Sequence, residues 1–182
     1  MLQRAYALAA EAHGSQRRAT DQRLFVDHVL EVATLLHDAG FDKELIAAGL
    51  MHDAVERGTA TERGVRAEMG DAIASLVMAL TEDRSLESFA ARKAGLRAQV
   101  MAAGPRAITI FAADKLSDIR GLQRGIDASR DSIEARMGAS IAAMAGHYRE
   151  SVELIESSEP SSRFVPALRQ ALEILTTPDK PA

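Results

Sequence analysis

The sequence predicts an all-α, single-domain bundle of about eight helices. Alanine supplies 34 of the 182 residues, whereas there are five Phe, two Tyr and no Trp. Alanine loses little free energy on entering a helix, while the scarce aromatic residues are those that suit strands. Apolar residues recur at intervals of three and four along nearly the whole chain, which is the spacing of amphipathic helices. A chain of this length usually forms one domain.

The composition excludes several classes of protein. With 47% hydrophobic and 26% charged residues, the chain is neither disordered nor low in complexity. The absence of cysteine excludes disulfides, thiolate metal sites and cysteine nucleophiles. A net charge of −4 argues against a nucleic-acid polymer as partner. We expect neither a signal peptide nor a membrane span, and therefore a cytoplasmic protein, because charges interrupt every apolar stretch.

The expected helices of the first half each have an apolar face and a recognisable end. They cover approximately residues 2–13, 28–40, 42–58, 61–69 and 71–80. Gly40 is typical of a helix C-terminus, and Asp42 and Thr61 are typical N-caps, since their side-chain oxygens can accept from unpaired backbone N–H groups. The polar, arginine-rich segment 15–27 is expected to be a loop.

The second half predicts four more helices. They cover approximately residues 87–102, 106–122, 129–155 and 166–175. The apolar run 108–113 is interpreted as helix, although its propensity leaves a buried strand open. The apolar face of the last helix could pack on its own chain or on a second copy, so a homodimer is also open. We expect the domain to cover residues 1–176 and a polar tail to cover 177–182.

Charged side chains interrupt two apolar runs. His52 and Asp53 directly follow one run, and Asp114 directly follows another. An unpaired carboxylate near a core costs several kcal/mol unless something compensates it. A divalent cation is one solution, because imidazole and carboxylate are its usual ligands when thiols are absent. His28, at the start of the second expected helix, could supply a further donor to the same set.

Glu56 lies where a general base would be useful. It is four residues after His52 and three after Asp53, which places it on the same face of a helix. It would then lie beside a bound ion, in position to take a proton from an attacking water. The same spacing is also compatible with buried ion pairs and no metal: Asp53 could pair with Arg57, and Asp114 could pair with a core arginine or cap a backbone group.

Cationic residues accompany the proposed site. Arg17 and Arg18 lie in the loop before the second expected helix, and Lys115 follows Asp114. Guanidinium groups suit phosphate oxygens because they bind them in pairs. A solvated polar loop remains the alternative for the two arginines. Asp118 repeats the four-residue step from Asp114 on the same expected helix.

These residues stand in four short segments. The segments are Gln16-Arg17-Arg18, Phe25-Val26-Asp27-His28, Met51-His52-Asp53-Ala54-Val55-Glu56 and Ala113-Asp114-Lys115-Leu116. In this order they resemble the HD-domain metal-dependent phosphohydrolases. Within that superfamily they most resemble the hydrolase half of RelA/SpoT enzymes and the small stand-alone relatives that hydrolyse (p)ppGpp. The resemblance runs from Ala5 to about Leu122, and residues 148–175 are similar to the C-terminal helices of the small members.

The resemblance implies a fold, a cofactor and roles for particular residues. The fold is the all-helical HD fold, and the cofactor is one divalent metal ion, typically Mn²⁺. The implied metal ligands are His28, His52, Asp53 and Asp114. Glu56 matches an acid that helps to activate or position the attacking water. Arg17 and Arg18 match a basic loop associated with the nucleotide, and Lys115 would help them to hold phosphates.

Three departures from the family pattern lead to two hypotheses. Arg57 replaces an acid of the catalytic motif, Ala19 replaces a lysine of the basic loop, and Asp118 replaces an asparagine at the substrate. The first hypothesis is hydrolysis of a phosphorylated nucleotide, such as a (p)ppGpp-like 3′-pyrophosphate. The second is a degenerate module that keeps its ion and binds a phosphorylated ligand as a sensor. A different HD activity, nucleotide monophosphatase or phosphodiesterase, is a third.

Overall fold

Residues 1–159 and 161–176 are described by the computed structural model, and nine helices run through them without a strand. The helices are α1 (Leu2–His13), α2 (Phe25–Asp38), α3 (Lys43–Met51), α4 (Glu62–Met69), α5 (Asp71–Ala79), α6 (Phe89–Ala103), α7 (Pro105–Met137), α8 (Ile141–Ser158) and α9 (Val165–Thr176). The all-α prediction is confirmed, and the nine helices of the described residues are close to the predicted count of about eight. The predicted tail at 177–182 lies outside the described residues.

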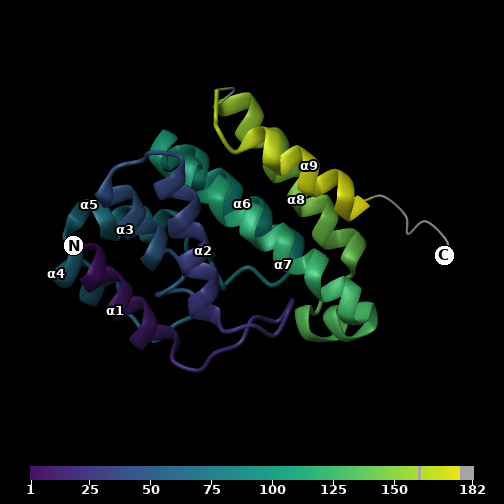
Figure 1. The fold of residues 1–182 in the computed structure, drawn as a ribbon, viewed down its shortest axis with the longest axis horizontal. Coiled ribbons are helices and arrows are strands. Elements are labelled where there is room, and N and C mark those ends of the chain that lie inside the picture. The colour runs from purple at the N-terminus through teal and green to yellow at the C-terminus, as the bar shows by residue number, and fades with distance from the viewer. Residues whose placement is uncertain (160, 177–182) are drawn as a thin grey trace.

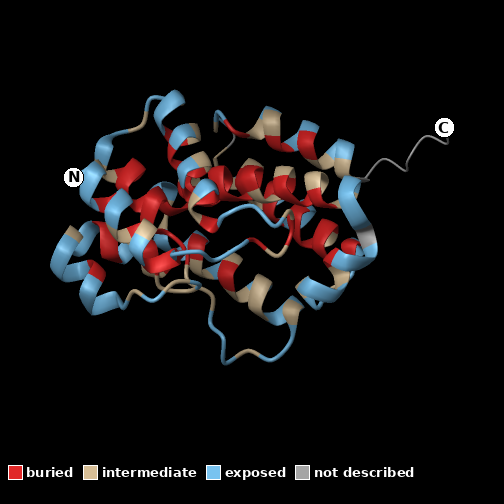
Figure 2. Cartoon of the chain, turned by 60° about the horizontal axis from the view of Figure 1, so that its bottom comes forward, coloured by how far each residue is buried: buried red, intermediate tan, exposed pale blue. Residues whose placement is uncertain are grey.

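Helix α7 is the central element of the fold. It runs through the middle of the molecule, with α8 and α9 along one side and the N-terminal helices on the other (Figure 1). It contacts α2, α3, α5, α6, α8 and α9. Because neighbours surround its first half, Ile110, Phe111 and Ile119 are completely buried, and the buried interior follows the helix (Figure 2). Asp114 is therefore carried into the centre of the core.

The boundaries of α7 differ from those expected. The run 108–113 is helical, so the alternative of a buried strand is wrong. Residues 123–128, expected as a gap, continue the helix and pack closely on the loop that follows α1. A Cβ at Gly125 would lie 2.3 Å from the carbonyl oxygen of Thr20, so glycine permits this approach. The helix kinks at Ser129, whose φ and ψ are −172° and 106°.

The expected continuous helix over 129–155 is wrong. Gly138 has a φ of 61°, the left-handed conformation that ends many helices, and closes α7. Ser140 then begins α8, because its side chain accepts a hydrogen bond from the backbone N–H of Ala143. A glycine followed two residues later by a capping serine thus marks the end of one helix and the start of the next.

The segment that carries His52 and Asp53 is also not the helix interior that was expected over 42–58. Helix α3 ends at Met51, and both residues lie in the turns that follow. The chain turns there against α1, since a Cβ at Gly58 would lie 3.0 Å from the Cβ of Ala12. The two side chains are therefore oriented by a turn and not by helical periodicity.

The last helix packs on its own chain. Leu168 and Ala171 of α9 are buried, and the helix contacts α7 and α8. The apolar face of α9 thus packs on α7 and α8 of its own chain. A homodimer stays a prediction. Among the helices of the described residues, none is both long enough and apolar enough to cross a membrane.

Candidate metal centre and adjoining cleft

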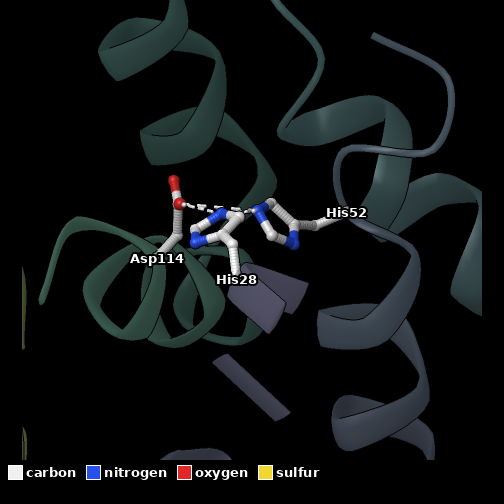
Figure 3. Close-up of side chains that lie close together, drawn as sticks. All are labelled: His28, His52 and Asp114. Carbon is white, nitrogen blue, oxygen red and sulfur yellow. Dashed lines mark hydrogen bonds and ion pairs between the residues drawn. The ribbon is translucent and has the colours of Figure 1, made fainter. Parts of the chain in front are cut away.

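Three buried side chains from distant segments meet at one point. His28 lies in the first turn of α2, His52 just beyond α3, and Asp114 in the first half of α7 (Figure 3). The Nε2 atom of His28 is 3.3 Å from Nε2 of His52 and 3.3 Å from Oδ1 of Asp114. One ligand atom from each residue lies within 4.8 Å of the others. This His–His–Asp group has the donor types of a divalent-metal site.

Asp53 adjoins the same group. Its Oδ2 atom lies 3.5 Å from Nε2 of His28 and 3.4 Å from Nε2 of His52. All four side chains that the resemblance implied as ligands are therefore neighbours, and each is at least nine-tenths buried. Their role as ligands stays a prediction at this point, since proximity alone also fits a network of buried ion pairs.

The hydrogen bonds behind the two imidazole rings show which nitrogen faces the group. Nδ1 of His52 is 2.8 Å from the carbonyl oxygen of Gly49, which can only accept, so Nδ1 carries the proton. Nδ1 of His28 is 2.9 Å from the hydroxyl of Ser117. In the neutral ring of His52, the lone pair on Nε2 then points at the carboxylates of Asp53 and Asp114. With this ring neutral, acceptors converge at the group, an arrangement that fits a bound cation.

The electrostatics of the group also favour a positive charge. Burial opposes the charged form of His52, but Asp53 and Asp114 outweigh it and raise the pKa of His52 to about 9. Burial likewise opposes ionisation of Asp114, yet Lys115 and the two histidines hold the pKa of that carboxyl well below its usual range. The carboxylates remain ionised, and the space between them favours a proton or a metal cation.

Lys115 and Arg18 compensate carboxylates beside this centre. Nζ of Lys115 lies 2.7 Å from Oδ2 of Asp114 and 2.9 Å from Oδ2 of Asp118. Arg18 donates from Nη2 to Oδ1 of Asp118 over 2.9 Å. Both cations are almost fully buried. The structure thus brings Asp118 and two of the predicted phosphate-binding cations together, in a network that leads away from Asp114.

Arg17 is not part of this network. Its side chain is exposed and donates from Nη1 to the carbonyl oxygen of Gln22 over 2.8 Å, within its own loop. The loop doubles back, because Arg17 pairs with Leu24 in an isolated bridge. Adjacent arginines therefore point in different directions, and only Arg18 reaches the candidate site.

Glu56 and Arg57 lie on the open side of the group. Oε2 of Glu56 accepts a hydrogen bond of 2.9 Å from the backbone N–H of Glu82, and Oε1 lies 3.5 Å from Nη2 of Arg57. Burial, together with the negative charge of Asp53, raises the pKa of Glu56. Nε of Arg57 is 3.8 Å from Oδ1 of Asp53, so the ion pair considered as an alternative is present beside the histidines.

A cleft joins these residues. The charged side chains that line it are Arg18, Asp53, Glu56, Arg57, Glu82, Lys93, Asp114, Lys115 and Asp118. They comprise five carboxylates and four cations, so the lining has an excess of one negative charge. A divalent cation would reverse that excess. With a divalent ion bound, the cleft is suited to an anionic ligand. Without that ion, the negative excess of the lining disfavours an anion.

Sequence reasoning missed His147 as part of this cleft. It is buried and lines the cleft. Arg97 of α6 donates from Nη1 to Nδ1 of His147 over 2.8 Å. Nε2 has no hydrogen-bond partner in the described residues. Because arginine only donates, the neutral ring must carry its proton on Nε2. No sequence signal reveals this pair, whose members are 50 residues apart.

Replacing His147 by leucine is expected to change the pH dependence of stability. Burial, followed by the nearby Lys115, Lys93 and Arg97, holds the pKa of His147 far below its usual value. Below about pH 6.5 the unfolded chain binds a proton there and the folded chain does not, so acid lowers the free energy of unfolding. Urea unfolding of wild type and His147→Leu at pH 5 to 8 checks this.

The difference in unfolding free energy between the two proteins should be constant above pH 7. Below about pH 6 it should move in favour of the variant by about 1.4 kcal/mol per pH unit. His37→Leu, at an exposed histidine, controls for the loss of a histidine as such. Equal pH slopes for wild type and His147→Leu would contradict the assignment of a neutral, buried ring.

Comparison with known proteins places the chain in a family. The family model described as an HD domain matches residues 5–131. A guanosine-3′,5′-bis(diphosphate) 3′-pyrophosphohydrolase of Aquifex aeolicus is 32% identical over 123 residues, which are 66% of this chain and 18% of that protein. A GTP pyrophosphokinase rsh of Brucella ovis is 35% identical over 127 residues, 67% of this chain and 17% of that protein. This chain thus corresponds to less than a fifth of these relatives.

Solved structures share the fold. A metazoan orthologue of SpoT that hydrolyses ppGpp has a TM-score of 0.78 at 24% identity, covering 94% of this chain and 93% of that chain. A protein of Listeria monocytogenes has a TM-score of 0.70 at 29% identity, covering 80% of this chain and 96% of that chain. These similarities show the fold. The match of the family model over more than half of the chain shows that it belongs to the HD-domain family.

Proposed function

We propose that this chain is a metal-dependent phosphohydrolase that removes the 3′-pyrophosphate from a nucleotide of the (p)ppGpp type. The observation that carries the proposal is the convergence of two imidazoles and two carboxylates at the wall of a cleft that also contains a buried acid, Glu56. The names of the bacterial relatives supply the substrate class. Because this chain spans only a small part of those relatives, their activity is part of the proposal.

The proposed metal ligands are His28, His52, Asp53 and Asp114, and the proposed metal is Mn²⁺. A set of imidazole and carboxylate donors without thiolate suits this ion. When bound, such a cation supplies Lewis acidity toward a phosphoryl oxygen and an attacking water. The burial of the four residues keeps them preorganised and excludes bulk water from all but the open side.

The remaining residues of the cleft divide the work of proton transfer and anion binding. Glu56 takes the proton of the attacking water, for which a raised pKa makes its carboxylate a stronger base. The backbone N–H of Glu82 holds one of its oxygens in place. Arg57 and Lys93 bind phosphate oxygens at the mouth of the cleft. Arg18 and Lys115, held by Asp118, stabilise the charge deeper in the cleft, and Arg17 has no role.

The test is a substrate panel with the purified chain and Mn²⁺. The expected result is release of pyrophosphate from ppGpp, leaving GDP, with slower or no reaction of nucleoside monophosphates and cyclic nucleotides. Metal content is measured on the same sample. A sample that holds Mn²⁺ but releases neither phosphate nor pyrophosphate from any member of the panel would contradict the proposal.

Arg57 favours a second candidate, a non-catalytic module that binds a phosphorylated ligand. Its guanidinium lies near the carboxylates of both Asp53 and Glu56. A permanent positive charge there stabilises the ionised form of Glu56 and so weakens it as a base, while it favours a bound phosphate. This module would bind ppGpp in the presence of Mn²⁺ without turnover.

Two substitutions separate the candidates. For the hydrolase, Glu56→Gln is expected to lower kcat by about 10² to 10⁴-fold with little change in Mn²⁺ affinity, because the general base is lost and the ligands remain. Arg57→Asp is expected to raise KM, because an anion-binding charge is reversed. Hydrolysis that appears only in Arg57→Asp would instead establish the module. Steady-state kinetics with ppGpp measures both variants.

A further inference from the structure

A series of hydrogen bonds, buried at His28 and Ser117 and partly exposed at Glu31, lies behind His28, on the edge of the ring that faces away from the metal centre. Nδ1 of His28 is 2.9 Å from Oγ of Ser117, and that hydroxyl donates to Oε2 of Glu31 over 2.8 Å. Ser117 is completely buried on α7, and Glu31 lies one turn after His28 on α2. These hydrogen bonds therefore join the two helices that carry His28 and Asp114.

The number of available protons determines which group donates and which accepts in each of these hydrogen bonds. Glu31 accepts, and two arginines lie beside it: Nη1 of Arg120 at 3.5 Å from Oε1, and Nη2 of Arg124 at 3.8 Å from Oε2. Ser117 has a single hydroxyl proton, which goes to Glu31. The serine oxygen can then only accept from His28, so Nδ1 of His28 carries a proton and Nε2 keeps its lone pair.

We propose that Ser117 and Glu31 are a positioning pair that keeps His28 in the tautomer able to bind the cation. The proposal rests on the metal binding of the proposed function and adds two residues to it. The pair fixes the orientation of the ring and keeps the lone pair of Nε2 on the side of the metal centre. Hydrogen-bond partners of this kind typically change metal affinity 10- to 100-fold when removed.

A purely structural link between α2 and α7 would leave the tautomer of His28 unchanged when it is removed, whereas loss of a positioning pair changes that tautomer. Without the serine hydroxyl, a proton on Nδ1 of His28 would be buried and unpaired, so the ring would favour the other tautomer. Without the carboxylate of Glu31, the hydroxyl of Ser117 is free to donate to Nδ1, with the same result. In both cases the proton moves to Nε2, the atom that must face the cation.

The experiment is a calorimetric Mn²⁺ titration of the whole chain without nucleotide. Ser117→Ala and Glu31→Leu are each expected to weaken Mn²⁺ binding about 10- to 100-fold. Glu31→Gln keeps an acceptor for the hydroxyl but loses the charge, and is expected to fall between Glu31→Leu and wild type. Ser151→Ala is the matched control, because Ser151 is equally buried and its hydroxyl bonds to the backbone of α8. Its affinity should equal that of wild type.

Nitrogen NMR of the imidazoles in the cation-free protein provides a second measurement. Wild type should show Nδ1 of His28 protonated, and Ser117→Ala should show the proton transferred to Nε2, while urea unfolding reports any loss of stability separately. Wild-type Mn²⁺ affinity in both Ser117→Ala and Glu31→Leu would overturn the pair. If wild type binds no Mn²⁺, the proposed function fails and the NMR tautomers alone decide whether the pair exists.

Discussion

Asp114→Asn is expected to remove tight Mn²⁺ binding and to lower the rate of ppGpp hydrolysis by about a thousandfold or more. The substitution keeps the shape of the side chain but replaces a charged oxygen by a neutral amide. Oδ1 of Asp114 lies within 3.4 Å of Nε2 on both histidines, at the point where the candidate ligands converge. Lys115 would at the same time lose the charged partner 2.7 Å away, while its ion pair with Asp118 remains.

Asp118→Asn is the matched control for this prediction. It makes the same chemical change one turn later on α7, in the same network of Lys115 and Arg18. We expect it to keep wild-type Mn²⁺ affinity, because within the described residues Asp118 forms its hydrogen bonds and ion pairs with Arg18 and Lys115 and not with either histidine. Calorimetric titration and the ppGpp assay measure both variants. Equal loss of Mn²⁺ binding in both would show that the whole network, and not Asp114 as a ligand, determines affinity.

The affinity for Mn²⁺ is expected to rise about tenfold for each pH unit between pH 7 and pH 9. The reason is the pKa of His52, which the neighbouring carboxylates raise to about 9 against the effect of burial. Since Gly49 accepts the proton on Nδ1, the titrating proton occupies Nε2, the atom that would bind the cation. Below the pKa this proton must leave before the cation binds, so acid weakens binding and alkali strengthens it.

The same competition predicts that about one proton leaves the protein for each Mn²⁺ bound at pH 7. Titrations in two buffers of different ionisation enthalpy count these protons, and titrations at several pH values give the slope. An affinity that stays constant from pH 7 to pH 9, with no proton release, would show that His52 is neutral in the cation-free protein. The carboxylates of Asp53 and Asp114 would then not hold a proton on its Nε2 atom.

The sequence predicted the helical class, the order of the elements and several of their starts. The side chains of Asp42 and Thr61 accept from backbone N–H groups, as N-caps do. Helix ends marked by glycine were harder to predict, because glycine serves two purposes. Gly138 ends a helix through its left-handed conformation, whereas Gly125 lies inside a helix where another backbone approaches. Residue type alone does not separate a stop from a close contact.

The candidate site was predictable where polar residues interrupt apolar runs. Those residues stand out in the sequence because burial makes their charges costly. Their partners do not stand out, since an isolated serine or glutamate is common on any helix. Ser117 and Glu31 are 86 residues apart, and only the packing of α7 on α2 brings them together. Likewise, no spacing rule distinguishes Arg18, which enters the site, from Arg17, which does not.

Under the proposed function, the charge of the cleft lining makes metal and nucleotide bind cooperatively. Because a divalent ion adds positive charge to a lining of five carboxylates and four cations, an anionic nucleotide meets a more favourable potential after the ion has bound. Thermodynamic linkage is reciprocal, so the nucleotide must tighten the hold on the ion by the same factor. Where manganese is scarce, the chain would therefore fill with metal chiefly when its nucleotide accumulates, and activity would respond to both concentrations together.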